Sequence, residues 1–120
     1  MDQQKQLQAL SDQYQGLQNE LTTLVQARQK LEGQFTENES VQKEFAGLDD
    51  DAKIYKLVGP VLLKQETSEA KSTVDGRLEY IGKEIKRIEE SITEIQGKSE
   101  GKRSEIMQIQ AQAQQSAGKA

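Results

Sequence analysis

The sequence predicts a mainly α fold, in which two long helices form an antiparallel coiled-coil hairpin and a short β-hairpin connects them. Apolar residues recur at alternating spacings of three and four in residues 5–47 and again in residues 68–111, as the seam of a coiled coil requires. Between these segments, residues 53–64 read KIYKLVGPVLLK, a mostly apolar and β-favouring stretch. All 120 residues are therefore expected to form a single domain.

The first helix is predicted over residues 5–47, where eight of the ten seam positions are apolar. The ten positions are Leu7, Leu10, Tyr14, Leu17, Leu21, Leu24, Arg28, Leu31, Phe35 and Asn38. After Asn38 the spacing slips by one residue, which locally changes the winding of a supercoil. Gly47 and the aspartates that follow it predict the end of the helix and a loop.

The second helix is predicted over residues 68–111. Thr67, Ser68 and Ser72 are candidate N-caps, and Ser72 with Asp75 resembles a capping box. The seam then reads Val74, Leu78, Ile81, Ile85, Ile88, Ile92 and Ile95 without interruption. Residues 112–120 are expected to form a flexible tail, because the apolar pattern is lost there. Antiparallel pairing of the two segments predicts partners whose residue numbers add to about 116.

The seam is predicted to be weak at one level. Polar residues interrupt the apolar seam there: Ser99 and Lys102 occupy seam positions of the second helix, opposite Leu17 and Tyr14. Three glycines fall at the same level: Gly16, Gly97 and Gly101. Each glycine costs a helix roughly 1 kcal/mol, so we expect a stiff stem near the β-hairpin and a looser, partly opened tip. The alternative is that these glycines are merely tolerated on the surface.

An apolar cluster lies beyond this level, near both ends of the chain. It consists of Leu7, Leu10, Ile106, Met107 and Ile109. On a frayed tip these side chains would stay partly exposed, and exposed apolar surface of this kind marks a binding place. A flexible surface without fixed polar donors would be poorly selective. The alternative is an ordinary seam end that binds no partner.

The β-hairpin is predicted to turn at Gly59-Pro60, because glycine adopts backbone angles that other residues avoid and proline fixes its own φ. The strands on either side carry Ile54, Tyr55, Leu57 and Val58, then Val61, Leu62 and Leu63. A lone hairpin is marginal in water and leaves unpaired strand edges. We therefore expect it to join strands of other chains, which makes this chain one subunit of a larger assembly.

Composition argues against several classes of function. The net charge of −4 disfavours binding to nucleic acid or to an anionic membrane. No run of about 20 apolar residues is present to span a bilayer. The chain has no cysteine and no histidine, so no zinc site, other metal site or cofactor is expected, and a cytoplasmic location fits best.

Acidic side chains offer the nearest approach to catalysis or metal binding. Asp49–Asp51 suggests a metal site, but no other ligand has fitting spacing, so a solvated acidic loop is the better interpretation. Glu89 with Glu90, and Glu37 with Glu39, lie on or beside long helices with no cleft to desolvate them. The chain is therefore not expected to be an enzyme.

The chain resembles the β-class subunits of prefoldin in its order of helix, β-hairpin and helix and in the sequence of its hairpin. The matching stretches are Gln29–Leu31 (QKL), Thr36–Asn38 (TEN), Tyr55–Glu66 (YKLVGPVLLKQE), Glu69–Lys71 (EAK) and Gly76–Arg87 (GRLEYIGKEIKR). The similarity extends from about Gln29 to Glu90, and the ends match only in pattern. A single β-hairpin fits the β class, because an α-class subunit would carry two.

The resemblance implies a heterohexamer in which this chain joins two α-class and three further β-class subunits. Residues Ile54–Leu63 would contribute strands to an intersubunit β-barrel. The tips would hold unfolded proteins, especially actin and tubulin chains, and pass them to the cytosolic chaperonin without ATP. The assignment of client contact to Leu7, Leu10, Ile106, Met107 and Ile109 rests on their position alone.

Two other functions compete with this one. A passive coiled-coil scaffold or tether would bind one folded partner through the hairpin and would not need its tips. An amphipathic helix on a membrane surface is the third alternative, but the apolar stripe is narrow and the net charge is negative.

Overall fold

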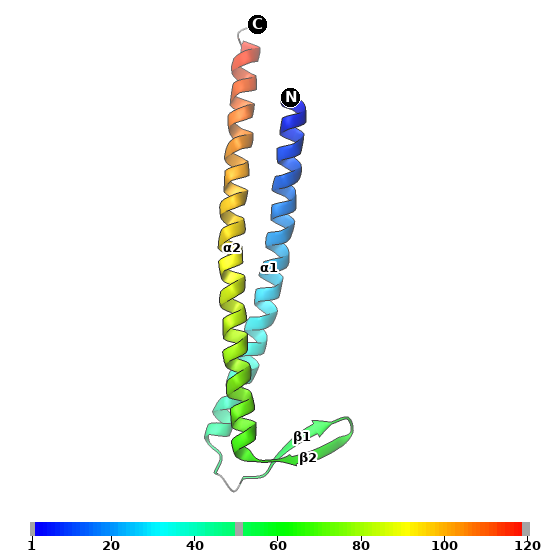
Figure 1. Cartoon of the computed structure of the whole chain (residues 1–120), viewed down its shortest axis with the longest axis vertical. Helices are drawn as coiled ribbons and strands as arrows, with labels where there is room; N and C mark the ends of the chain where they lie inside the picture. Colours follow the sequence, from blue (N-terminus) through cyan, green and yellow to red (C-terminus); the bar gives the residue numbers. More distant parts are fainter. Residues whose placement is uncertain (1, 50–51, 119–120) are drawn as a thin grey trace. The chain divides into compact units, whose positions relative to one another are not determined.

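The computed structural model describes residues 2–49 and 52–118, and its elements follow the predicted order (Figure 1). They are α1 (Gln3–Ala46), β1 (Ile54–Val58), β2 (Val61–Gln65) and α2 (Thr67–Gly118). The predicted mainly α class with one β-hairpin is confirmed. The described chain forms two compact units, and each helix contributes a segment to both. The single-domain assignment stays a prediction.

The two units are named here by what they contain. The hairpin unit is Arg28–Arg87, and the terminal unit is Met1–Ala27 together with Ile88–Ala120. In both units the predicted seam positions are buried or half-buried, whereas most residues between them are exposed. The buried apolar residues of α2 are Ala70, Val74, Leu78, Ile81, Ile88, Ile92 and Ile95. The heptad interpretation is therefore confirmed.

The helix segments pair antiparallel within each unit. In the hairpin unit, Gln42 Nε2 donates a hydrogen bond to Asp75 Oδ1 at 2.8 Å, and a Cβ on Gly82 would lie 3.8 Å from the Phe35 ring. In the terminal unit, Gln18 Nε2 donates to Ser99 Oγ at 2.5 Å. The residue numbers of each pair add to 117, one more than the predicted sum.

The helix boundaries correct two predictions. Helix α2 continues to Gly118, so the predicted helix end at residue 111 is wrong. That residues 112–120 are flexible stays a prediction, and Lys119 and Ala120 lie outside the described residues. Glutamine and alanine dominate this stretch and are good helix formers, which sustain the backbone hydrogen bonds without a seam. The capping box is also wrong, because α2 begins at Thr67 and Ser72 lies inside it.

Helix α1 ends at Ala46, one residue before the predicted end. Its last turn tightens, because the Gly47 N–H donates to the Glu44 carbonyl at 3.2 Å and the Leu48 N–H donates to the Phe45 carbonyl at 3.1 Å. Such shorter-range bonds satisfy carbonyl groups that a helix end leaves without partners.

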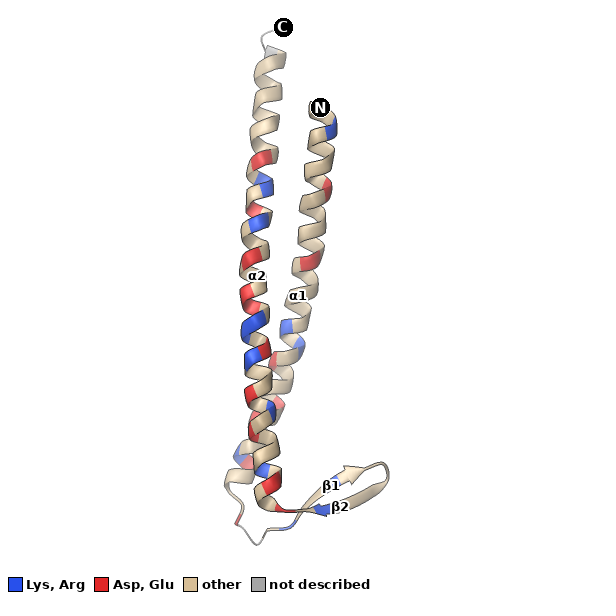
Figure 2. Cartoon of the chain, viewed as in Figure 1, with Lys and Arg blue, Asp and Glu red and all other residues tan. Residues whose placement is uncertain are grey.

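Charged residues are spread along α1 and along α2 as far as Glu105, whereas the charged residues of the β-hairpin are all basic (Figure 2). Helix α2 contains the ion pairs Glu79–Lys83 and Glu94–Lys98, each with a nitrogen–oxygen distance of 3.2 Å. Exposed pairs of this spacing add only a few tenths of a kcal/mol. Within residues 2–49 and 52–118, neither helix contains a stretch apolar enough to cross a membrane.

Candidate functional site

The β-hairpin is a regular antiparallel pair closed by a two-residue turn. Ile54 pairs with Gln65 at the open end, and Val58 pairs with Val61 next to the turn. Gly59 has φ +58°, and the ring of Pro60 holds its φ near −65°. A positive then a negative φ fits the type II′ turn, which matches the twist of the flanking strands. The predicted turn at Gly59-Pro60 is thus present.

Both faces of the hairpin are apolar and open to solvent. Paired residues share a face, so the register places Val58, Val61 and Leu63 on one face and Tyr55, Leu57 and Leu62 on the other. All six side chains are between 49% and 67% exposed. A sheet with one face in water normally alternates apolar and polar residues. This hairpin does not, so neither face is suited to permanent contact with water.

The root of the hairpin, in contrast, is anchored to its own unit. Ile54 is only 9% exposed, and it shares the lining of a pocket with Phe45 of α1 and Val74 of α2. Thr67, also buried, donates a hydrogen bond from Oγ1 to the Ala52 carbonyl at 3.0 Å. The hairpin is therefore fixed at residues 52–54 and 67 and projects beyond them (Figure 1).

Each strand of the hairpin has one unpaired edge, because the sheet of the described residues has two strands only. Unpaired edges present backbone N–H and C=O groups that form hydrogen bonds with a further strand. Open edges and two apolar faces together make residues 54–63 a surface suited to joining other strands. That these residues make the assembly contacts stays a prediction.

The predicted tip cluster is more closely packed than expected. Leu10 is 7% exposed, and Leu7, Ile106 and Ile109 are half-buried. Met107 is the exposed member, at 57%. The predicted fraying is therefore not seen at Leu10. Client contact by these five residues stays a prediction.

A groove of about 800 Å³ lies at the predicted weak level of the terminal unit. It is lined by Gln13, Gly16, Leu17, Glu20, Lys98, Gly101, Lys102 and Glu105. Two of the three predicted glycines thus line it, and Gly97 does not. A Cβ at any of the three would meet no atom within 4 Å, so packing against neighbours does not require glycine there.

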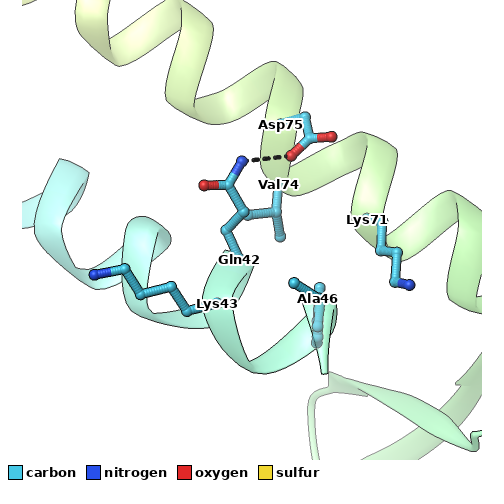
Figure 3. A pocket seen from close by; sticks show the side chains of 7 residues that line it. Gln42, Lys43, Ala46, Lys71, Val74 and Asp75 are labelled. Atoms are coloured by element: carbon cyan, nitrogen blue, oxygen red, sulfur yellow. Dashed lines mark hydrogen bonds between the residues drawn. The ribbon is translucent and has the colours of Figure 1, made fainter. Parts of the chain in front are cut away.

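A smaller pocket of about 340 Å³ lies in the hairpin unit between α1 and α2 (Figure 3). Phe45, Ala46 and Val74 supply its apolar lining. Gln42 and Asp75, which share a hydrogen bond, also line it. Its ionisable side chains are Lys43, Lys71 and Asp75. Among the described residues, no three metal-ligating side chains cluster, while Asp50 and Asp51 of the acidic loop lie outside them.

Comparison with known proteins agrees with this architecture. The sequence profile of the family described as Prefoldin subunit matches residues 8–113. Prefoldin subunit 6 of Mus musculus is 46% identical over 122 residues, covering 98% of this chain and 96% of the mouse protein. Prefoldin subunit 6 of Saccharomyces cerevisiae is 49% identical over 100 residues, covering 83% and 88%.

The solved structures point the same way. The crystal structure of the prefoldin beta subunit from Thermococcus strain KS-1 superposes with a TM-score of 0.80 at 26% identity, covering 86% of this chain and 90% of that one. The family profile covers most of the chain, and close relatives match it almost end to end. The chain therefore belongs to the prefoldin subunit family, and its resemblance to the β class is confirmed.

Proposed function

We propose that this chain is a co-chaperone subunit that captures unfolded polypeptides and delivers them to the cytosolic chaperonin without using ATP. Prefoldin subunits are components of a chaperone-associated hetero-oligomer. The observation that carries the proposal is the β-hairpin with two exposed apolar faces, because it commits the chain to assembly with other subunits. The partners would be two α-class and three further β-class subunits, in the cytoplasm.

The free helix ends are the proposed site of client capture. From Ile106 to Gly118, helix α2 carries no charged side chain, and Met107 projects from it with 57% of its surface exposed. Methionine is flexible and polarisable, so it adapts to apolar groups of many shapes. An uncharged surface of this kind suits segments of unfolded actin or tubulin, which share apolar character and no fixed shape.

The test is aggregation of denatured actin in the presence of the assembled complex, with full-length chains. Met107→Glu replaces the exposed apolar group by a charge and is expected to weaken suppression of aggregation. Gln108→Glu places the same charge on the neighbouring exposed position, and should leave suppression unchanged. Native mass measurement must show equal assembly of all three complexes. No suppression by the wild-type complex would refute the co-chaperone function.

A passive scaffold is the second candidate, and the buried Leu10 favours it, because a tip that covers its own apolar residues offers less to a client. A scaffold would retain folded partners and ignore unfolded ones. Pull-down with native and with denatured actin separates the two functions. Preferential retention of denatured actin supports the co-chaperone. Preferential retention of native actin, or retention of neither form with intact assembly, supports the scaffold.

A further inference from the structure

The β-hairpin has a charge opposite to that of the whole chain. Between Lys53 and Gln65 there are three lysines, Lys53, Lys56 and Lys64, and no acidic residue. The complete chain has a net charge of −4, so the excess of acidic residues lies outside the hairpin (Figure 2). The surface that must join other strands is therefore basic as well as apolar.

The lysines are distributed over both apolar faces. Lys56 pairs with Leu63 and shares the face of Val58, whereas Lys64 pairs with Tyr55 on the opposite face. Both lysines are exposed, and neither forms an ion pair among the described residues. Each face thus combines three exposed apolar side chains with one ammonium group whose charge nothing in the described chain balances.

We propose that Lys56 and Lys64 select the partner strands, which are those of sister subunits with carboxylates facing these two lysines. This inference rests on the proposed function, since it concerns the strands that the hairpin joins within the assembly. Charge complementarity across an interface favours one partner over others, and juxtaposed like charges disfavour the wrong partner. Lysines on an edge strand likewise disfavour pairing with an identical edge.

A second copy of this chain is the partner that the lysines exclude. Two copies joined through their hairpins would bring six lysines and no carboxylate together between residues 53 and 65. Opposite charges on a sister strand would instead balance Lys56 and Lys64 as the apolar faces become buried. The same two lysines would therefore lower the affinity of the hairpin for a second copy of this chain and raise its affinity for an acidic strand of a sister subunit.

The test uses full-length chains and a purified α-class prefoldin subunit as the probe, with affinity measured by titration calorimetry. Lys56→Glu/Lys64→Glu is expected to weaken binding by about tenfold or more, with the difference shrinking as salt is added. The control Lys30→Glu/Lys86→Glu makes the same charge change on exposed helical lysines of the hairpin unit, and should bind within about twofold of the wild type. Far-UV circular dichroism verifies the helices of each variant.

A mixture of the reversed variant Lys56→Glu/Lys64→Glu with the wild type gives a second measurement, in which binding is gained. The reversed variant mixed with the wild type should form a heterodimer more readily than either chain forms a homodimer, as measured by sedimentation. Equal binding of the α-class subunit by the reversed variant and the wild type would overturn the inference, because the lysines would then only keep the edge soluble. Lysine-dependent binding to phosphatidylserine vesicles in place of the α-class subunit would also overturn it. Failure of the wild type to bind that subunit would refute the proposed assembly itself.

Discussion

Thr67 donates a hydrogen bond from Oγ1 to the carbonyl oxygen of Ala52 at 3.0 Å, across the base of the β-hairpin. The two residues flank the strands, with Ala52 before β1 and Thr67 as the first residue of α2. Thr67 is only 7% exposed, so water cannot readily replace it as the donor. This bond closes the root of the hairpin, and it acts together with the buried Ile54 to fix where the strands leave the helices.

Replacement of Thr67 by valine tests the importance of this bond. Valine keeps the shape of the side chain but removes the donor, which leaves the Ala52 carbonyl without its partner. We expect the free energy of unfolding to fall by about 1–2 kcal/mol, measured by urea denaturation. Thr67→Ser retains the hydroxyl and should lose less. Equal stability of the two variants would show that the carbonyl finds another donor.

Gly59 is the position at which the hairpin requires glycine. Its φ of +58° lies in the left-handed region, which costs an ordinary L-residue roughly 1–2 kcal/mol. Gly59→Ala should therefore loosen the turn and weaken binding to an α-class subunit by about tenfold, measured by calorimetry. Asparagine tolerates this region better, so Gly59→Asn should bind more tightly than Gly59→Ala. The opposite order would mean that the turn changes type on assembly.

Periodicity and turn chemistry predicted most of this fold because both act locally. The heptad spacing marked the seam residues, and Gly59-Pro60 marked the turn. The start of α2 was harder to predict, since Thr67, Ser68 and Ser72 were all plausible caps. The role of Thr67 depends on Ala52, which lies 15 residues away in sequence, and no local pattern shows that contact.

The far end of the terminal unit was predicted less well, for a related reason. Loss of the apolar pattern after Ala111 predicted that the second helix ends there, but helix propensity carries α2 to Gly118. Similarly, the glycines near Gly16 suggested an open tip, whereas Leu10 beyond them is buried. Residue numbers of facing residues add to 117, so Leu10 faces the level of Met107, which was already inside the predicted helix. The burial of Leu10 therefore means that the three glycines do not open the seam there.

Stability should vary little with pH near neutrality. The chain has no histidine, and the hydrogen bond that Arg87 donates to Glu84 raises the pKa of Arg87 above its ordinary value. A raised pKa contributes stability that is fully present below the ordinary value and is lost only as pH rises through the raised one. Thermal unfolding at about pH 6.5 and 8.5 should therefore give similar midpoints. A clear drop within this window would indicate an ionisation coupled to assembly.

The polar pair Gln18–Ser99 is expected to help fix the helix register in the terminal unit. Gln18 Nε2 lies 2.5 Å from Ser99 Oγ. Ser99 is 5% exposed and occupies a position of the α2 seam, in which most residues are apolar. A double-mutant cycle with Gln18→Ala and Ser99→Ala should give a coupling energy of about 1 kcal/mol. Ser99→Leu should raise the thermal midpoint, because apolar seam residues are more stable though less specific. A coupling near zero would show that each side chain bonds elsewhere.

The glycines of the terminal unit should be replaceable with a gain in stability. A Cβ at Gly16, Gly97 or Gly101 would meet no atom within 4 Å, and none of the three has a positive φ. Alanine at each position should therefore add up to about 1 kcal/mol to the free energy of unfolding, measured by urea denaturation.

Gly82→Ala is the matched control in the hairpin unit, where the added Cβ would make an ordinary 3.8 Å contact with Phe35, and it should give a similar gain. The functional readout separates two roles of the terminal glycines. If the triple alanine variant is more stable but suppresses actin aggregation less well, while Gly82→Ala suppresses it normally, then the glycines keep the helix ends adaptable for clients. If both variants gain stability and suppress aggregation equally, client capture does not depend on a loosened seam, and the groove beside Gly16 and Gly101 is only a gap in packing.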